Sequence, residues 1–138
     1  MADTYEAVQR ALYAKLVTAL TPLSCPVYDY VPEDQPYPYL VTGSHTADPD
    51  DTFREVYTIH RIILAVYAGP NEGASGAVRG KAQARRIVEA ARNGLHHVKL
   101  TLDAGTCVRC QVERINIDVA DDVKTADASM IVRIDVAE

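Results

Sequence analysis

The chain contains little of what usually identifies an enzyme, a membrane protein or a secreted domain. Tryptophan is absent, phenylalanine occurs once and cysteine three times in 138 residues. An odd and small number of cysteines argues against a disulfide framework and is typical of reduced thiols in the cytoplasm. No window reaches the ~20 apolar residues of a membrane span. We therefore expect one cytoplasmic domain over residues 1–138, without a membrane partner.

Positive charge is also scarce. Lysine and arginine total 14 against 19 aspartates and glutamates, so the formal net charge is −5. Proteins that grip the nucleic-acid backbone use lysine and arginine to displace counterions. This charge balance argues against binding to the DNA backbone, although DNA could pass through a channel of such subunits without being bound.

Motifs for catalysis are missing as well. No nucleophile elbow, dinucleotide-binding glycine motif or phosphate loop occurs. Cys107 and Cys110 have the spacing of a redox pair or of half a zinc site, but on a predicted strand residues three apart point to opposite faces. Zinc would also require two further ligands. We predict no enzyme, no cofactor and no metal site, with both cysteines as small thiols; a thiol or metal enzyme is the rival hypothesis.

Apolar periodicity predicts two helices and six strands. The helices are expected at about residues 4–20 and 77–95. The strands are expected near 27–31, 39–42, 56–67, 98–102, 108–119 and 128–136. The polar, acidic segment 45–52 is predicted as a loop at the tip of a hairpin. The fold class is therefore α+β, a mostly antiparallel β-sheet packed against two helices in the order α-β-β-β-α-β-β-β.

Some elements carry finer expectations. The strand 56–67 is apolar on both faces in its second half, which predicts a central position. Apolar parity changes between Val112 and Ile115, which predicts a β-bulge near Glu113. His96 and His97 follow the stop signal of the second helix, where we expect them to cap its end.

Tyrosines and prolines gather between the first helix and the long strand. Tyr28, Tyr30, Tyr37 and Tyr39 give rigid contact area with a hydroxyl that tolerates a wet rim, as is common in protein interfaces. Prolines at 32, 36 and 38 favour extended backbone. Two interpretations stay open for the tyrosines: an interface with another subunit, or partial burial under the second helix.

The order of elements, together with VYDYVP at 27–32 and PYPYLVTG at 36–43, resembles the tail-completion (tail-terminator) proteins of long-tailed bacteriophages and gene transfer agents. The resemblance implies an α+β subunit without catalytic residues that assembles as a ring of six. Such a ring caps the head-proximal end of the tail tube, stops tube growth and joins tail to head. Its implied partners are copies of itself, the tail-tube protein and a head-completion or connector protein. It implies assembly in the host cytoplasm and residence in the virion tail.

We expect the contacts of such a ring to use the tyrosines, the acidic loop and the basic face of the second helix. The candidate interface residues are Tyr28, Tyr30, Tyr37, Tyr39, Asp48, Asp50, Asp51, Arg85 and Arg92. The alternative function is a small-ligand-binding module without catalysis, whose pocket would be lined by Tyr57, His60 and Arg61.

Overall fold

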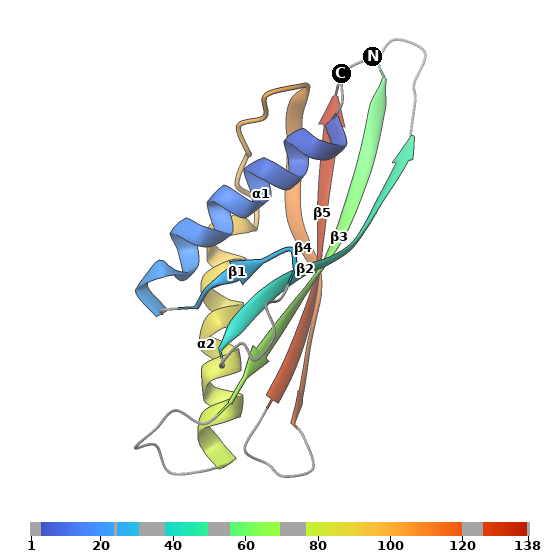
Figure 1. Ribbon diagram of the computed structural model, residues 1–138. Helices are drawn as coiled ribbons and strands as arrows, with labels where there is room; N and C mark the ends of the chain where they lie inside the picture. Colours follow the sequence, from blue (N-terminus) through green and yellow to red (C-terminus); the bar gives the residue numbers. More distant parts are fainter. Residues whose placement is uncertain are drawn as a thin grey trace.

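Two helices lie on one face of a single five-stranded sheet, with the strands in the order β1-β2-β3-β5-β4 (Figure 1). This computed structural model describes residues 4–23, 25–30, 38–49, 56–69, 77–119 and 126–137. The predicted α+β class, with a mostly antiparallel sheet and two helices, is confirmed. The observed order is α-β-β-β-α-β-β, one strand fewer than predicted.

The two helices have the predicted bounds. Helix α1 (Thr4–Leu20) is followed by a 3-10 turn, η1 (Thr21–Leu23), because Pro22 cannot continue the helix. Helix α2 spans Ala77–Leu95. Each buries one stripe at helical spacing: Val8, Leu12, Leu16 and Leu20 in α1, and Ala84, Ile87, Val88, Ala91 and Leu95 in α2.

The strands alternate in direction across most of the sheet. Strand β1 (Val27–Tyr28) is parallel to β2 (Tyr39–Pro49), and all other neighbours are antiparallel. The remaining strands are β3 (Tyr57–Ala68), β4 (Thr106–Val119) and β5 (Ala126–Ala137). Strand β3 lies at the centre, as its apolar faces predicted.

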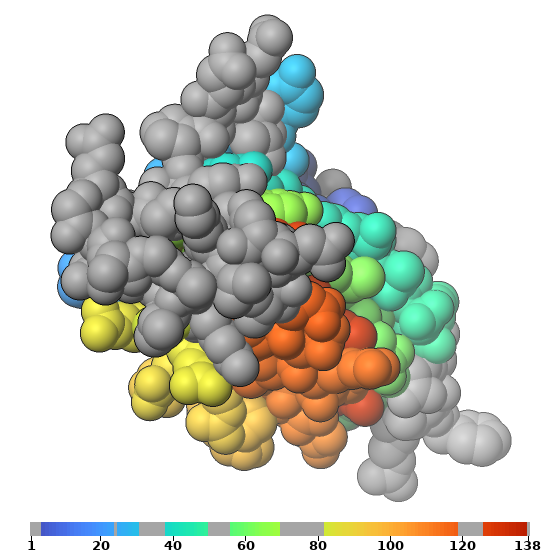
Figure 2. Space-filling view, turned by 90° about the horizontal axis from the view of Figure 1, so that it is seen from below, coloured from blue at the N-terminus to red at the C-terminus, as the bar shows by residue number. Residues whose placement is uncertain are grey.

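The core lies between the helices and one face of the sheet. Strand β3 contributes Ile62, Leu64 and Val66, and β5 contributes every second residue from Ala126 to Val136. No described helix lies on the opposite face; in Figure 2 the side chains of β2, β3, β5 and β4 follow one another from the right to the lower centre of the molecule. We call this second surface the open face.

Two predicted elements are wrong. Residues 98–102 form no strand; Val98 N–H instead donates to Leu95 C=O at 3.2 Å, and Leu100 is buried against the core without a partner strand. Residues 45–49 are strand, not loop, and pair with 58–62 of β3. Their polar character reflects an edge position, which needs no apolar residues. The remainder of the predicted tip, 50–52, and the link 31–37 lie outside the described residues.

Strand β4 contains two register shifts. One, between Val112 and Arg114, is the predicted bulge at Glu113. The other, between Cys107 and Arg109, was not predicted. It turns Val108 outward, where 46% of the side chain is exposed, and leaves Cys107 and Cys110 both buried. The expectation that residues three apart point to opposite faces is therefore wrong for these cysteines, because a bulge adds one residue between them.

Adjacent residues of β3 provide a test of the face assignment. We expect Leu64→Ala to lower the free energy of unfolding by about 2–5 kcal/mol, because Leu64 is completely buried and truncation leaves a cavity. Ile63→Ala is the matched control, with an expected loss below about 1 kcal/mol, because Ile63 lies on the open face and is 41% exposed. Chemical denaturation measures both; equal losses would contradict the assignment.

Candidate functional site

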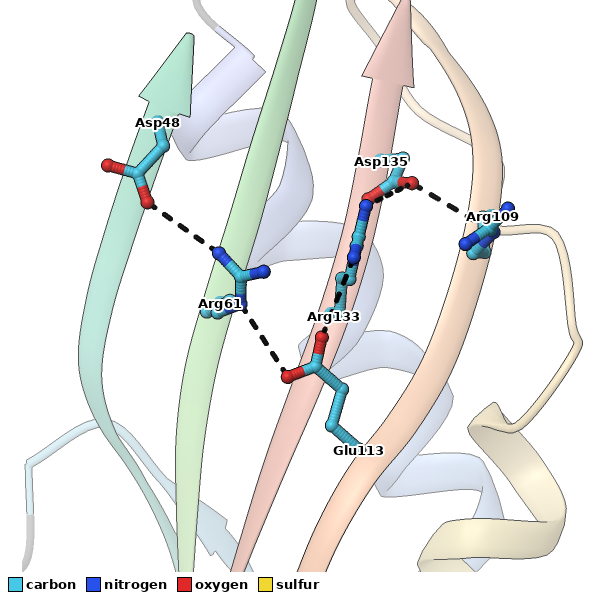
Figure 3. A network of polar contacts seen from close by, with 6 residues as sticks. All are labelled: Asp48, Arg61, Arg109, Glu113, Arg133 and Asp135. Carbon is cyan, nitrogen blue, oxygen red and sulfur yellow. Dashed lines mark hydrogen bonds and ion pairs between the residues drawn. The ribbon is translucent and has the colours of Figure 1, made fainter. Parts of the chain in front are cut away.

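A chain of six charged side chains crosses the open face from β2 to β4 (Figure 3). It contains three acids and three bases: Asp48, Arg61, Arg109, Glu113, Arg133 and Asp135. We call it the charge ladder. At one end, Arg109 Nε lies 3.9 Å from Asp135 Oδ2. The ladder is formally neutral although the whole chain is acidic.

Two arginines connect the acids of the ladder. Arg61 lies 3.7 Å from Asp48 and 3.6 Å from Glu113, and Arg133 lies 3.9 Å from Glu113. Arg133 also donates two hydrogen bonds to Asp135, from Nε at 2.8 Å and from Nη2 at 3.2 Å. Single exposed pairs of this length stabilise little, whereas the bidentate pair orients both of its partners. The ladder therefore makes the upper open face polar and ordered.

The tyrosines form a second cluster, where β1 meets the start of β2. Tyr28 and Tyr39 meet edge-on with ring centroids 6.5 Å apart, and Tyr39 lies 5.2 Å from Tyr67. Tyr39 and Tyr67 lie on the open face, so burial under α2 is excluded for Tyr39. Tyr30 is 82% exposed. Tyr37 lies outside the described residues.

The remaining candidate interface residues lie apart from the tyrosines. Arg85 and Arg92 lie on the exposed side of α2 and make no ion pair with any described residue. Asp48 belongs to the charge ladder on the opposite side of the sheet. Asp50 and Asp51 fall outside the described part of the chain. The described residues of this set thus lie in three places: the tyrosine cluster at the start of β2, the charge ladder near the end of β2 on the open face, and the exposed side of α2.

A pair of histidines, the buried His60 and the half-buried His45, connects α1 to the sheet and was not predicted. His45 Nε2 and His60 Nδ1 are 2.7 Å apart, and His60 Nε2 lies 3.3 Å from Thr4 Oγ1. Gln9 Nε2 lies 3.0 Å from His45 Nδ1. The ring of Tyr5 stacks on His45 with centroids 3.7 Å apart. Sequence analysis missed this contact because it placed His45 in a loop.

One set of tautomers satisfies every nitrogen of this pair. Gln9 donates to His45 Nδ1, His45 Nε2–H donates to His60 Nδ1, and His60 Nε2–H donates to Thr4 Oγ1. Both imidazoles are then neutral. Burial, with the neighbouring His60, lowers the pKa of His45 to about 4, and burial also lowers the pKa of His60.

The pocket predicted for a small ligand does not exist. His60 points into the core, whereas Tyr57 and Arg61 lie on the open face, because odd and even residues of β3 face opposite sides. A cleft of about 420 Å³ lies elsewhere, between α1 and β1, and is lined by Gln9, Arg10, Leu12, Tyr13, Tyr28 and Asp29 among others. Glu6 also lines this cleft, and its carboxylate lies 3.8 Å from Arg10.

The cysteines are buried and free. Burial, with the neighbouring Cys107, raises the pKa of Cys110 to about 12, and burial raises that of Cys25 to about 11. Both thiols therefore stay protonated at neutral pH and are poor nucleophiles. Among the residues that the structure describes, no three His, Cys, Asp or Glu side chains gather as a metal-binding group.

His96 and His97 contact the edge of β4 instead of only ending α2. His97 N–H donates to Cys110 C=O at 2.8 Å, and Val112 N–H donates to His96 Nδ1 at 3.1 Å. His97 has a left-handed backbone, with φ of 60°. Partial burial, with His97 and Arg92 nearby, lowers the pKa of His96, which keeps Nδ1 free to accept. The predicted cap on a helix carbonyl by an imidazole ring is therefore replaced by a cap on a strand amide.

A family model described as "Tail completion protein gp17" matches residues 6–137. The chain belongs to this family. Among solved structures, the fold is similar to a chain of the "Virion of native gene transfer agent (GTA) particle", with a TM-score of 0.75 and 19% identity over 100% of both chains. A search of curated proteins found no match. The predicted family resemblance is thereby confirmed.

Membership makes this a tail completion protein, a structural and non-enzymatic component of a virion. The family therefore confirms the prediction that the chain is not an enzyme, and it argues against the thiol-enzyme hypothesis for Cys107 and Cys110. Neither described helix has the length and apolar character needed to cross a membrane. The surfaces described above are thus candidates for contacts within a particle.

Thiol reactivity tests the burial of the cysteines. At pH 8 we expect Cys110 of the native protein to react with a small disulfide reagent at least about 100-fold more slowly than after unfolding, because its thiol is buried and protonated. Val108→Cys is the matched control, because this neighbouring position is exposed and should react quickly without unfolding. Fast modification of the native wild type would contradict the buried placement.

The histidine pair predicts acid sensitivity. Folding lowers the pKa of His45 from its ordinary 6.5 to about 4, so the unfolded chain binds more protons between these values and stability falls as the pH falls. From pH 7 to pH 5 we expect a loss of about 1 kcal/mol, roughly half the full linkage value, because solvent screens a partly exposed ring. In His45→Gln the loss should shrink, as measured by thermal unfolding at each pH. An unchanged pH profile would contradict the assignment.

Proposed function

We propose that this tail completion protein forms a closed ring of six subunits that caps the head-proximal end of a tail tube. The ring would end tube growth and join the tail to the head, in a bacteriophage or gene transfer agent particle. The observation that best supports this proposal is the sheet itself. Its long strands β2 and β4 each leave part of their outer edge without a strand partner among the described residues, because the outermost strand β1 has only two residues.

Unpaired strand edges are a hazard for a protein that acts alone and a resource for one that assembles. Two different edges on one subunit favour a head-to-tail contact, which closes into a ring when the rotation between subunits divides a full turn. The gene transfer agent virion provides a precedent for this fold in a particle, at 19% identity. The ring proposal therefore rests on topology rather than on any single side chain.

The exposed tyrosines and the free arginines are proposed to contact other components. Tyr30 is the most exposed large apolar side chain described, and Arg85 and Arg92 are cations without a described partner. A tail-tube protein and a head-completion or connector protein are the partners proposed for these surfaces. Tyr28, Tyr37, Tyr39, Asp48, Asp50 and Asp51 remain proposed interface residues. Assembly is proposed to take place in the host cytoplasm.

DNA would have to cross such a ring. The net charge of −5 on each subunit and the neutral charge ladder provide no surplus of cations with which to hold a phosphate backbone. We expect passage of DNA without specific binding. This agrees with a component that must not arrest the genome during delivery.

Native mass spectrometry and negative-stain imaging test the ring, with and without tail tubes of the same particle. We expect rings of six, either free or at one end of each tube, and tubes that stop growing once capped. Subunits that stay monomeric in both conditions would overturn the proposal.

Tyr30 tests the tyrosine surface. We expect Tyr30→Ser to weaken binding to tubes or to neighbouring subunits about 10-fold, a loss typical of a buried aromatic anchor, without lowering thermal stability. Val108→Ser is the matched control, because Val108 is also an exposed apolar side chain but lies on β4, at the opposite edge of the sheet from β1. An equal effect of both substitutions would argue against a specific role for Tyr30.

A further inference from the structure

Two long strands of the sheet, β2 and β4, have an outer edge that is covered along only part of its length. Strand β1 pairs with Leu40 and Val41 of β2, and no described strand covers the outer edge of 45–49. On β4, His97 and His96 satisfy the backbone of Cys110 and Val112, and no described residue covers 114–119. The two uncovered segments lie at opposite ends of the sheet, on opposite sides (Figure 1).

The directions of these segments suit a head-to-tail contact. Strands β2, β3, β5 and β4 alternate in direction, so β2 and β4 run antiparallel to each other. If a second copy has the same orientation, its β4 can therefore extend the sheet beside β2 as a further antiparallel strand. In this contact between copies, which we call the joint, strand directions would continue to alternate from one copy to the next.

The backbone groups of the two segments also match. The C=O of Cys110 and the N–H of Val112 point outward from the free edge of β4, because they bond to His97 N–H and His96 Nδ1 outside the sheet. The extra residue at 113 shifts the alternation by one, so beyond the bulge the outward-pointing N–H and C=O groups belong to Ile115 and Ile117. On β2, Leu40 N–H points outward and donates to Pro26 C=O at 2.9 Å; with the register shift between Thr42 and His45, alternation gives His45 and Ala47 the same outward direction. His45 C=O also accepts from Tyr5 O–H at 3.2 Å.

The faces agree as well. Ile115 and Ile117 lie opposite Met130 and Ala128 on the helix face, and Arg114 and Asn116 lie on the open face. On β2, His45 and Ala47 lie on the helix face and Thr46 and Asp48 on the open face. Of the registers that match both backbone and faces, one sets Asp48 opposite Arg114, which makes no ion pair with a described residue. The next register along sets Asp48 opposite Asn116 and Thr46 opposite Asp118.

We propose that β2 of one copy pairs with β4 of the next, with Ala47 opposite Ile115 and Asp48 opposite Arg114. This inference rests on the proposed ring and specifies its interface. Pro49, which has no N–H to donate, would face the bulge at Glu113, where no regular pair is possible. The half of β4 that His96 and His97 cover would lie beyond the end of β2.

The proposed register also agrees with closure. Inside one subunit, His45 pairs with Ile62, Ile62 with Val132 and Val132 with Val112, so His45 and Val112 lie on one line across the sheet. In the proposed contact, His45 of one copy lies opposite Ile117 of the next copy instead. Without the bulge residue, the step from Val112 to Ile117 shifts the pairing by ~13 Å along the strands, while the four strands of one subunit span ~19 Å across the sheet. These two lengths correspond to a strand tilt of ~35° relative to the ring axis. Closed barrels have strand tilts of ~35–45°. A ring built on this joint would carry a continuous sheet with the helices on one side.

Disulfide trapping tests the register. Thr46→Cys combined with Asn116→Cys places two thiols at a directly opposed pair whose Cα atoms would be ~4.5 Å apart, within disulfide range. Under mild oxidation we expect a ladder of covalent multimers that ends at the ring size. Thr46→Cys with Asp118→Cys, which suits the alternative register, should give at least about 10-fold less product. The native cysteines are buried and serve as the background control.

Charge reversal provides a second measurement. We expect Arg114→Glu to weaken self-association about fivefold, because like charges would then face each other across the joint. Adding Asp48→Asn should recover much of the loss, because the like charge is removed while the amide oxygen can still accept from Arg61. Arg86→Glu on the exposed side of α2 is the matched control and should have little effect on this joint.

The outcomes separate this inference from the proposed function. Rings that form normally but give no disulfide between positions 46 and 116, or prefer 46 with 118, overturn this register and leave the ring intact. Absence of rings in the wild type, both alone and on tail tubes, overturns the ring and this inference together.

Discussion

The division of the described strand residues between the two faces of the sheet depends on the uninterrupted pairing of β3 with β5. The two strands pair from Tyr57 opposite Ala137 to Ala68 opposite Ala126 without a register shift. Because side chains alternate between the faces of a strand, this pairing directs one apolar set under the helices and the other residues to the open face. A slip of one residue would exchange the two sets and expose the core, so the core itself holds the register.

The same division decides the chemistry of the polar groups. His60 lies on the buried face, where a charge would be costly, and it is accommodated as a neutral ring hydrogen-bonded to His45 and Thr4. Its neighbour Arg61 lies on the open face and is paired with Asp48 on β2. His60 and Arg61 thus lie on opposite faces of the sheet, one apolar and one polar. For this reason the two side chains cannot line one ligand pocket.

Irregularity is confined to the outer strands. Register shifts occur in the β2–β3 pair between Thr42 and His45, and twice in β4, whereas the central pair has none. Bulges are common at sheet edges because a distorted edge pairs less readily with the wrong partner. Here they also determine which backbone groups point outward. In this tail completion protein, part of each of the edges of β2 and β4 is covered or distorted and part is free to pair with another strand. A selective contact between copies needs both, because the covered part excludes wrong partners and the free part binds the right one.

The sequence by itself determined the elements whose signal is local. Both helices, the central strand and the bulge at Glu113 follow from apolar spacing, because that spacing reflects the period of the backbone. The same reasoning failed at 98–102, where alternation arises from packing without a partner strand, and at 45–49, where an edge strand carries no apolar pattern. The contact of His45 with His60 and the shared face of Cys107 and Cys110 were decided only by the tertiary structure, because both depend on strand register, which no local period encodes.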